Sequence, residues 1–418
     1  MWFTTIITIF LVTVAGALVV PNYPSNSDHP FGYDAAYSTE PVRVRKEWRQ
    51  LTIPQRKDYI RAVKCLHSTP GTYQDLVPSS LTMYEDFAAE HKLRTPFVHV
   101  ESQFLPWHRY FVWVYENALR KQCGYEGTQP YWDYSLDSHP GELRDSPIFD
   151  VEHGFGGAGE SVGPFPEMPP GLPTGSGGGC QKDGPFKDWT IHIAVRNFTE
   201  LRDDRCLTRS INEKVGRNWC TREVEEVVKR QPDYISMYQN LQGALGPYDQ
   251  YFGLHPCGHF IAGGPKAGAD IYLGPVDPLF YLHHANIDRI WWEWQARNIE
   301  ERTAEITGPL RPQPFLFPEE DYADFPDANI TLEWPLEMGR LAGPVKTREV
   351  MDIRQNIFNY QYTNPRAQYE DGKEVTDGEC PENGTEEFER KVAKLQERWE
   401  RFKGGPAWGR ARGGAPAP

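Results

Sequence analysis

Apolar side chains recur at helical spacing in the first third of the chain. Residues 106–121 repeat one face at steps of three and four residues, and Pro106 suits the first turn of such a helix. A helical pattern also starts near Trp48 and runs through 54–67. The same spacing predicts a helix over 81–92.

The second half of the chain shows further helical patterns. A charged helix is expected over 221–243 and a short helix over 250–262. Asp277 and Pro278 predict the start of another helix, because Asp is a good N-cap and Pro a good first helical residue. Apolar residues spaced 4-3-4-3 predict an amphipathic helix over 386–403 that packs on the body of the protein.

Two long stretches between these helices have no periodicity. Residues 138–190 contain GFGGAGE and PTGSGGGC, which predicts a long surface loop system held by Cys180. Residues 305–335 are a Pro-rich loop, and 404–418 are expected to be disordered. The pattern as a whole predicts a mainly α fold, in which a helical bundle core is wrapped by long loops and a few short strands.

The N-terminal residues predict a secreted protein. The stretch MWFTTIITIFLVTVAGALVV has no charged side chain, and Ala15-Gly16-Ala17 fits an A-x-A cleavage site, so residues 1–17 are expected to be a signal peptide. A signal anchor is the alternative, because the apolar run approaches the length of a membrane span. Sequons fit the secretory route and are found at Asn197, Asn329 and Asn383.

Charge and cysteine content narrow the choice of partners and compartment. The net charge of −14 argues against nucleic acid or an anionic membrane as a partner. Seven cysteines without a C-x-x-C pattern favour disulfides in an oxidising compartment, and the odd number leaves one cysteine over. Cys257 could close a disulfide or be that unpaired thiol.

Six of the twelve histidines fall into two sets with short spacings. Gaps of seven and eight residues separate the members of the first set, and the second begins with an i, i+4 pair on one helix face. The two sets are His91, His99 and His108, and His255, His259 and His284. Five others are expected to be structural or surface residues: His29, His67, His139, His153 and His192. Spacing alone does not separate metal ligands from coincidence.

The ligand type of these two sets favours copper. Three neutral nitrogen ligands per metal, with no carboxylate or thiolate close in sequence, suit copper and disfavour calcium or magnesium. Two such sets could hold two metal ions close enough to bind one small molecule together. Two Cu(I) ions could each give one electron to O2, and a helical bundle is a good frame for such a site.

The segments around these histidines resemble a known superfamily. FVHVESQFLPWHRYFVWVYENALR and GLHPCGHFIAGG, followed by DPLFYLHHANIDRIWWEW, look like the two copper-binding motifs of tyrosinases, catechol oxidases and hemocyanins. The resemblance extends from Arg45–Leu51 to Asn359–Tyr362 and is greatest to the short fungal form. It implies a catalytic domain over residues 18–370, followed by a C-terminal helix and flexible tail over 371–418.

The resemblance implies roles for individual residues. His91, His99 and His108 would bind one copper ion, and His255, His259 and His284 the other. His283 would be a neighbour that faces elsewhere. Asp288 and Arg289 match residues that fix the orientation of the ligands in the family.

The chain departs from the family pattern at several positions. Phe97 replaces the cysteine that forms a thioether in some relatives, so no such cross-link is expected. Pro256 stands where tyrosinases active on monophenols often have Asn, and Gln242 stands near the position of their Glu. Ile271 matches a Phe above the first copper in plant catechol oxidases, which suggests an open entrance. Phe260 could line that entrance, or both could be core residues.

The resemblance therefore implies a secreted enzyme that oxidises o-diphenols to o-quinones with two copper ions and reduces O2 to water. No catalytic side chain beyond the copper ligands is expected. The partners are O2 and a small phenol, with no nucleic acid and no membrane after signal cleavage. A tyrosinase that also hydroxylates monophenols and a tailoring oxidase of one metabolite remain alternatives. An oxygen carrier and a zinc-loaded, redox-silent relative are the others.

Overall fold

A computed structural model describes most of the chain. The described residues are 41–138, 143–195, 202–243, 251–312, 317, 322–323, 325–364, 369–370, 373–374 and 384–403. The expected signal peptide, the C-terminal tail 404–418 and Cys380 lie outside these residues. Within the described part, no helix is both long and apolar enough to cross a membrane.

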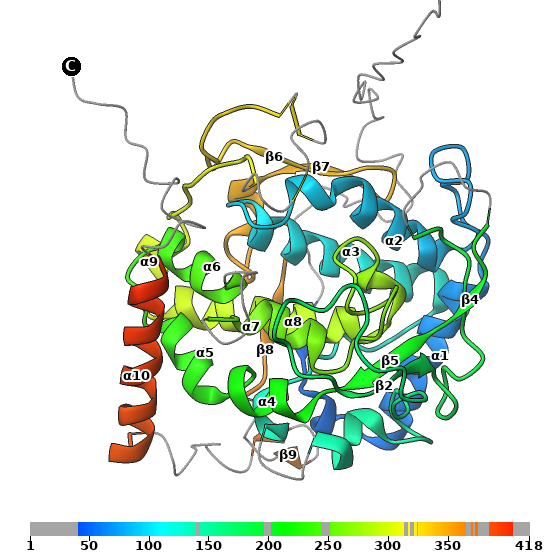
Figure 1. Cartoon of the computed structure of the whole chain (residues 1–418). Helices are drawn as coiled ribbons and strands as arrows, with labels where there is room; N and C mark the ends of the chain where they lie inside the picture. The colour runs from blue at the N-terminus through cyan, green and yellow to red at the C-terminus, as the bar shows by residue number, and fades with distance from the viewer. Residues whose placement is uncertain are drawn as a thin grey trace, which may run out of the picture.

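Long helices build the centre of the molecule, as the periodicity predicts (Figure 1). Helix α3 packs against both α1 and α8, and α7 packs against α8. The mainly α prediction is confirmed. The helices of this core are α1 (Ile53–Ser68), α2 (Met83–Arg94), α3 (Phe104–Cys123), α7 (Leu254–Phe260) and α8 (Leu279–Ala296).

Local sequence signals define the ends of these helices. The Thr82 side chain caps the start of α2, and the Glu85 side chain bonds back to the Thr82 backbone in a capping box. Helix α3 ends at Gly124, whose φ of 59° is left-handed and costs glycine little. Helix α8 begins one residue later than expected, with Pro278 rather than Asp277 at the N-cap, and an Asp277 carboxylate oxygen accepts a hydrogen bond from the Leu279 amide at 3.0 Å.

The helix expected over 221–243 is in fact two helices. The chain forms α5 (Arg222–Lys229) and α6 (Tyr234–Gln242), and the Asp233 side chain caps the second. Pro232 lies between them, where it lacks the amide hydrogen that a continuous helix needs. Two short helices, α4 (Glu213–Trp219) and α9 (Ile299–Arg302), complete this half of the molecule.

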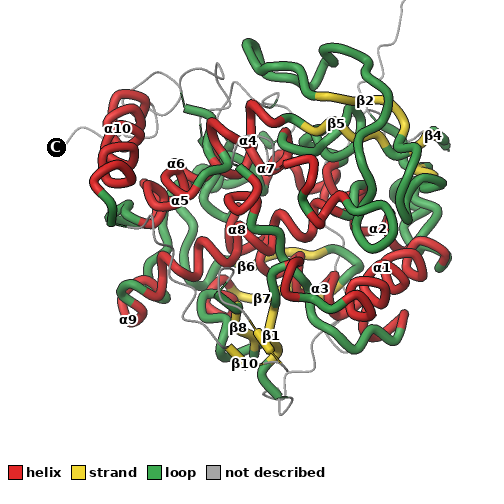
Figure 2. Tube along the Cα trace, turned by 90° about the horizontal axis from the view of Figure 1, so that it is seen from below, coloured by secondary structure: helices red, strands yellow, loops and turns green. Residues whose placement is uncertain are grey.

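Among the described residues, the strands form only two-stranded pairs, which lie around the helical centre (Figure 2). The pair of β1 and β8 is parallel and brings the two ends of the family-like region together. The pairs are β1 (Arg43–Arg45) with β8 (Tyr360–Tyr362), β2 (Ser176–Cys180) with β5 (Thr208–Ile211), β3 (Thr190–Ile191) with β4 (Arg205–Cys206), β6 (Pro335–Met338) with β7 (Ala342–Lys346), and β9 (Tyr369–Glu370) with β10 (Lys373–Glu374).

Among the described residues, three disulfides link elements that are distant in sequence. Cys180 pairs with Cys206 and holds the long loop, as expected. Cys257 pairs with Cys220, which settles the alternative left open by the sequence in favour of a disulfide. The third bond joins α1 to the end of α3, between Cys65 and Cys123.

The C-terminal helix α10 (Glu386–Lys403) lies at the edge of the molecule beside α5 (Figure 1). Phe388 and Val392 pack against Val227 of α5. Trp399 is fully buried, and its ring lies 5.3 Å from that of Tyr251. One face of α10 therefore packs on the body of the protein.

Candidate metal centre

The first histidine set comes together at the ends of α2 and α3. His91 lies in the last turn of α2, His108 in the first turns of α3, and His99 in the segment between them. One ligand nitrogen from each lies within 4.8 Å of the others. All three side chains are buried.

The second set comes from α7 and α8. His255 and His259 are one helical turn apart on α7, and their Nε2 atoms are 3.0 Å from each other. Both His283 and His284 of α8 join them, with ligand nitrogens within 4.8 Å. The lack of a side chain at Gly258 allows this close approach of α7 and α8, because a Cβ atom there would lie 2.0 Å from the His283 ring.

The two histidine sets face each other across a short distance. The rings of His108 and His284 are stacked, with centroids 4.4 Å apart, and those of His99 and His255 are 6.0 Å apart. Two aromatic rings fill the space beside them. Phe104 lies 4.5 Å from His255, and Phe280 lies 4.1 Å from His284, measured between ring centroids.

Backbone carbonyls orient most of the imidazoles. In four rings Nδ1 lies 2.8–3.0 Å from a carbonyl oxygen, which can only accept, so Nδ1 carries the hydrogen and Nε2 is left as the ligand atom. The carbonyls belong to Tyr272 for His91, Thr95 for His99, Phe104 for His108 and Gly268 for His259.

Several of these imidazole nitrogens lack a hydrogen-bond partner, which suits a bound metal ion. The Nε2 atoms of His91, His108 and His284 are buried, and none has a hydrogen-bond partner among the described residues. A buried polar atom without a partner costs free energy, which a bound cation would offset. Neither histidine cluster includes a carboxylate or a thiolate from the described residues, so the donor set is nitrogen alone and suits copper.

Burial keeps the imidazoles neutral, the state that a metal requires. Burial lowers the pKa of His99 to about 3 and the pKa of His259 to about 4. It also moves the pKa of His91 well below the ordinary value, with a smaller contribution from His99. Protons therefore do not compete with a metal for these nitrogens at neutral pH.

His283 differs from its expected orientation. The resemblance implies that His283 faces elsewhere, but its ring lies almost parallel to that of His255, with centroids 5.7 Å apart. Neither of its ring nitrogens has a hydrogen-bond partner among the described residues. The resemblance predicts one inward histidine at this position of α8, whereas the structure turns both members of the adjacent pair inward.

The other residues proposed to line the site differ in burial and in their contacts. The Gln242 side chain is bound to the backbone next to His99: its Oε1 accepts from the Val100 amide at 2.7 Å. Pro256 is buried in the first turn of α7. Phe260 is buried against Phe252, with ring centroids 5.8 Å apart, and Ile271 is half-buried.

Sequence reasoning missed the two aromatic residues that contact the histidines most closely. Phe104 is four residues before His108, and Phe280 is four residues before His284. Each phenylalanine therefore lies one helical turn from a histidine. That i, i+4 spacing is the signal that could have identified them.

A buried carboxylate fixes the part of α8 that carries His284. Asp288 lies one turn further along the helix, and it accepts hydrogen bonds from the Tyr360 and Tyr362 hydroxyls at 2.6 and 2.5 Å. The Arg109 guanidinium of α3 also donates to it. The next residue, Arg289, pairs with Glu225 of α5 at 2.9 Å, so α8 is held on two sides.

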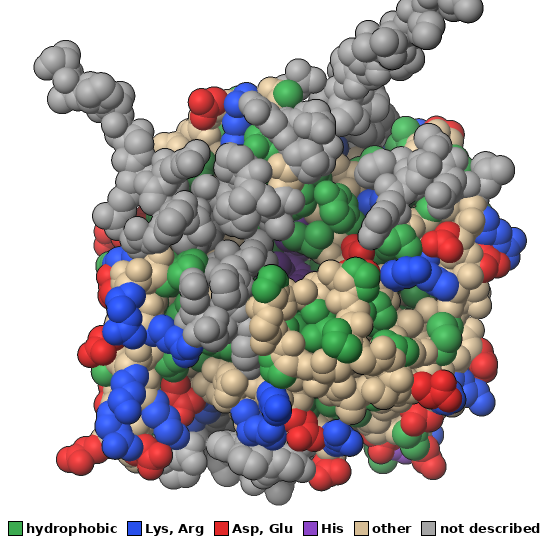
Figure 3. All heavy atoms as spheres, in the orientation of Figure 1, with side chains coloured by type: hydrophobic (Ala, Val, Ile, Leu, Met, Phe, Trp, Pro, Cys, Tyr) green, Lys and Arg blue, Asp and Glu red, His purple; other side chains and the backbone are tan. Residues whose placement is uncertain are grey.

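The histidine centre is reached from the surface. His259 is partly exposed, whereas the other five predicted ligands are buried. Figure 3 shows histidine side chains at the base of a hollow, with hydrophobic side chains beside it. A small aromatic molecule could contact both that apolar surface and the histidines.

Comparison with known proteins identifies the family. The common central domain of tyrosinase matches residues 81–297, which include both histidine sets. The chain belongs to the tyrosinase family. Tyrosinase P of Aspergillus terreus is 33% identical over 341 residues, which cover 77% of this chain and 92% of that protein.

Two further members of the tyrosinase family support the assignment. N-acetyl-6-hydroxytryptophan oxidase ivoB of Emericella nidulans is 34% identical over 352 residues, or 78% of this chain and 93% of that protein. A polyphenol oxidase variant from Thermothelomyces thermophila has a TM-score of 0.66 and 30% identity, and covers 77% of this chain and 89% of its own. This tyrosinase-family chain is therefore an enzyme of the type-3 copper oxidase class, and its family binds copper.

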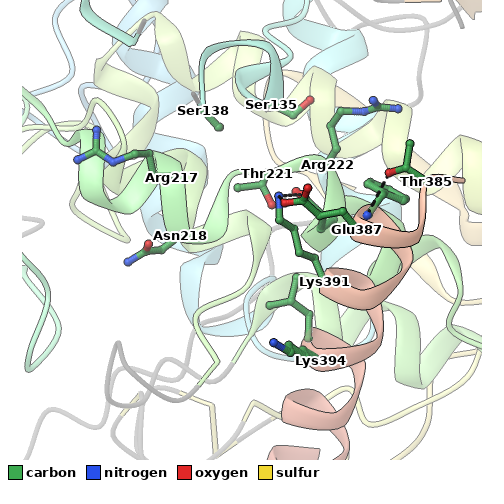
Figure 4. A pocket seen from close by; sticks show the side chains of 13 residues that line it. Ser135, Ser138, Arg217, Asn218, Thr221, Arg222, Thr385, Glu387, Lys391 and Lys394 are labelled. Carbon is green, nitrogen blue, oxygen red and sulfur yellow. Dashed lines mark hydrogen bonds and ion pairs between the residues drawn. The ribbon is translucent and has the colours of Figure 1, made fainter. Parts of the chain in front are cut away.

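A separate pocket of about 670 Å³ lies between α10 and the body of the molecule (Figure 4). No histidine lines it. The Lys391 ammonium group crosses it and pairs with Glu223 at 3.4 Å and Glu387 at 3.3 Å. The charges in this pocket thus join α10 to α5 and lie apart from the metal-binding chemistry.

Proposed function

We propose that this enzyme is a secreted diphenol oxidase, which converts o-diphenols to o-quinones at two copper ions and reduces O2 to water. The observation that carries the proposal is the pair of histidine groups, in each of which one ligand nitrogen per residue lies within 4.8 Å of the others. The ligands of one ion would be His91, His99 and His108, and those of the other His255, His259 and His284.

Bound copper would supply the electron transfer between the phenolic ring and O2. The chain's own residues orient and shield the reactants. Carbonyl oxygens hold the imidazole rings in fixed directions. Phe104 and Phe280 provide apolar walls that exclude water from the histidines.

The surroundings of the histidines favour diphenols over monophenols. Hydroxylation of a monophenol requires that its proton be removed, and the described clusters contain no carboxylate to accept it. Pro256 has no side-chain hydrogen-bonding group. Gln242 is an amide whose oxygen is already bound to the Val100 amide.

Several independent features support the proposal that the protein is secreted. The signal-like residues 1–17 and three disulfides both fit an oxidising, extracellular environment. The side chain of the sequon residue Asn329 is exposed, as glycosylation requires.

A tailoring oxidase is the second candidate. The relative from Emericella nidulans, which is 34% identical, is an oxidase of N-acetyl-6-hydroxytryptophan. A hydroxyindole of that kind is a fused aromatic ring with a phenolic hydroxyl, and the hollow beside the histidines is apolar enough to accept one.

O2 uptake by the purified, copper-loaded protein tests both candidates. Catechol, phenol and a 6-hydroxyindole are compared side by side, and the protein treated with a copper chelator is the control. Uptake with catechol and none with phenol supports the diphenol oxidase. Uptake with the hydroxyindole alone supports the tailoring oxidase. Immediate uptake with phenol, or full uptake after copper removal, contradicts the proposal.

A further inference from the structure

A third cluster of metal-binding side chains lies outside the copper centre. His67 of α1, Glu85 of α2 and His192, which follows β3, each place one ligand atom within 4.8 Å of the other two. Both histidines are expected from the sequence to be structural or surface residues, and the family resemblance assigns them no role. We propose that these three residues form a separate binding site for a divalent transition metal, with Zn²⁺ as the best match.

The His67 ring is held in the orientation of a metal ligand. Its Nε2 donates a hydrogen bond to the Thr190 carbonyl at 2.8 Å, which leaves Nδ1 as the free lone pair. The Trp189 ring stacks on it with centroids 3.8 Å apart and restricts its rotation. Burial lowers the pKa of His67, so the ring is neutral and able to bind a metal.

Backbone amides hold the Glu85 carboxylate close to both histidines. One carboxylate oxygen accepts hydrogen bonds from the Leu81 and Thr82 amides at 3.1 and 3.2 Å. The other accepts from the amide and the Nδ1 atom of His192 at 2.6 and 3.1 Å. The proton between His192 and this carboxylate occupies the position that a metal ion would take.

The composition and access of the cluster suit zinc. Two imidazoles and one carboxylate are a common zinc ligand set, in which the fourth position is left for water. Glu85 is buried, but the His192 side chain is 15% exposed and His67 is half-buried, so an ion can enter from solvent.

Metal at this site would connect three separate elements. It would join α1, α2 and the segment after β3, and Glu85 lies on the same helix as His91. The two residues are six positions apart, which is roughly 9 Å along a helix axis. Bound zinc would therefore stabilise the helix that carries a predicted copper ligand.

The test counts metals in the copper-loaded protein. After removal of free ions, Zn²⁺ is titrated by calorimetry, and bound copper and zinc are measured by elemental analysis. The wild-type protein is expected to bind one zinc ion per chain without loss of copper. His67→Ala and His192→Gln should each weaken zinc binding by at least about tenfold and leave the copper content unchanged.

Matched controls separate this site from the copper centre and from misfolding. His192→Gln keeps a hydrogen-bond donor for Glu85, so the variant should fold. His153→Ala removes a histidine outside the cluster and should bind zinc as the wild type does. Cobalt in place of zinc should give a visible absorption band that both site variants lose. Zinc that binds equally in all variants, or only by displacing copper, overturns the proposal.

Discussion

At the residue scale, Val100 has a strained backbone beside the candidate metal centre. Its φ is 58°, a left-handed value that a β-branched side chain rarely adopts, and it directly follows His99. The Gln242 side chain stabilises this turn, because its Oε1 accepts from the Val100 amide and its Nε2 donates to the Glu101 carbonyl at 3.5 Å. Gln242 thus positions the segment that follows a predicted ligand.

Substitution of Gln242 tests this positioning role. Gln242→Leu keeps the volume but leaves the Val100 amide buried without an acceptor, which should lower the free energy of unfolding by about 1–3 kcal/mol. It should also weaken copper binding, because the segment that carries His99 is released. Chemical denaturation of the apo protein and copper titration measure the two effects.

The conservative variant provides the control for that experiment. Gln242→Glu keeps an acceptor for the Val100 amide, so its losses of stability and copper affinity should be smaller than those of Gln242→Leu. Equal losses in both variants would show that the hydrogen bond to Val100 does not hold the turn.

At the element scale, α8 is oriented by its contacts with Asp288. The carboxylate receives hydrogen bonds from the hydroxyls of Tyr360 and Tyr362 on β8 and from Arg109 on α3. Arg45 of β1 lies 3.4 Å away. Since His284 is one turn earlier on the same helix, this network sets the direction from which that histidine enters the site.

Loss of the Asp288 charge should be costly. Asp288→Asn removes the carboxylate that pairs with the buried Arg109 guanidinium, whereas Arg45 keeps Glu116 at 2.9 Å. We expect a loss of about 3–5 kcal/mol in the free energy of unfolding. Asp58→Asn at the exposed pair with Arg61 is the control and should cost at most about 1 kcal/mol. Similar losses for the two variants in denaturant titrations would remove Asp288 from this role.

Helical periodicity was sufficient to predict the elements that repeat over several turns. The helix expected over 106–121 is α3, and that over 386–403 is α10. The prediction of one helix over 221–243 was wrong, because Pro232 and the Asp233 cap divide this segment into two helices. Strand β2 was missed, because it is glycine-rich and its partner β5 lies about thirty residues further along the chain.

The same limit applies to the candidate site. Histidine spacing and the family resemblance identified six residues that the structure brings together. The inward orientation of His283 depends on the contact of α7 with α8 at Gly258, which spacing does not reveal. The cluster of His67, Glu85 and His192 was missed for a similar reason, since its members come from three elements that are adjacent only in the folded chain.

At the scale of the whole molecule, two disulfides differ in their relation to the predicted copper ligands. The Cys220–Cys257 bond spans 37 residues and ties the end of α4 to α7, where Cys257 lies between His255 and His259. Both cysteines are fully buried. The Cys180–Cys206 bond spans 26 residues and joins β2 to β4, neither of which carries a predicted copper ligand.

Removal of each bond should have different consequences. Either paired substitution, Cys220→Ala with Cys257→Ala or Cys180→Ala with Cys206→Ala, frees a chain segment of similar length in the unfolded state. Each should therefore cost about 2–4 kcal/mol of stability. Only the first pair should also weaken copper binding at His255 and His259, because only that bond fixes the helix on which both histidines lie. Copper titration and thermal unfolding of the two variants measure this difference. An equal loss of copper affinity in both would show that general destabilisation, rather than the position of α7, controls metal binding.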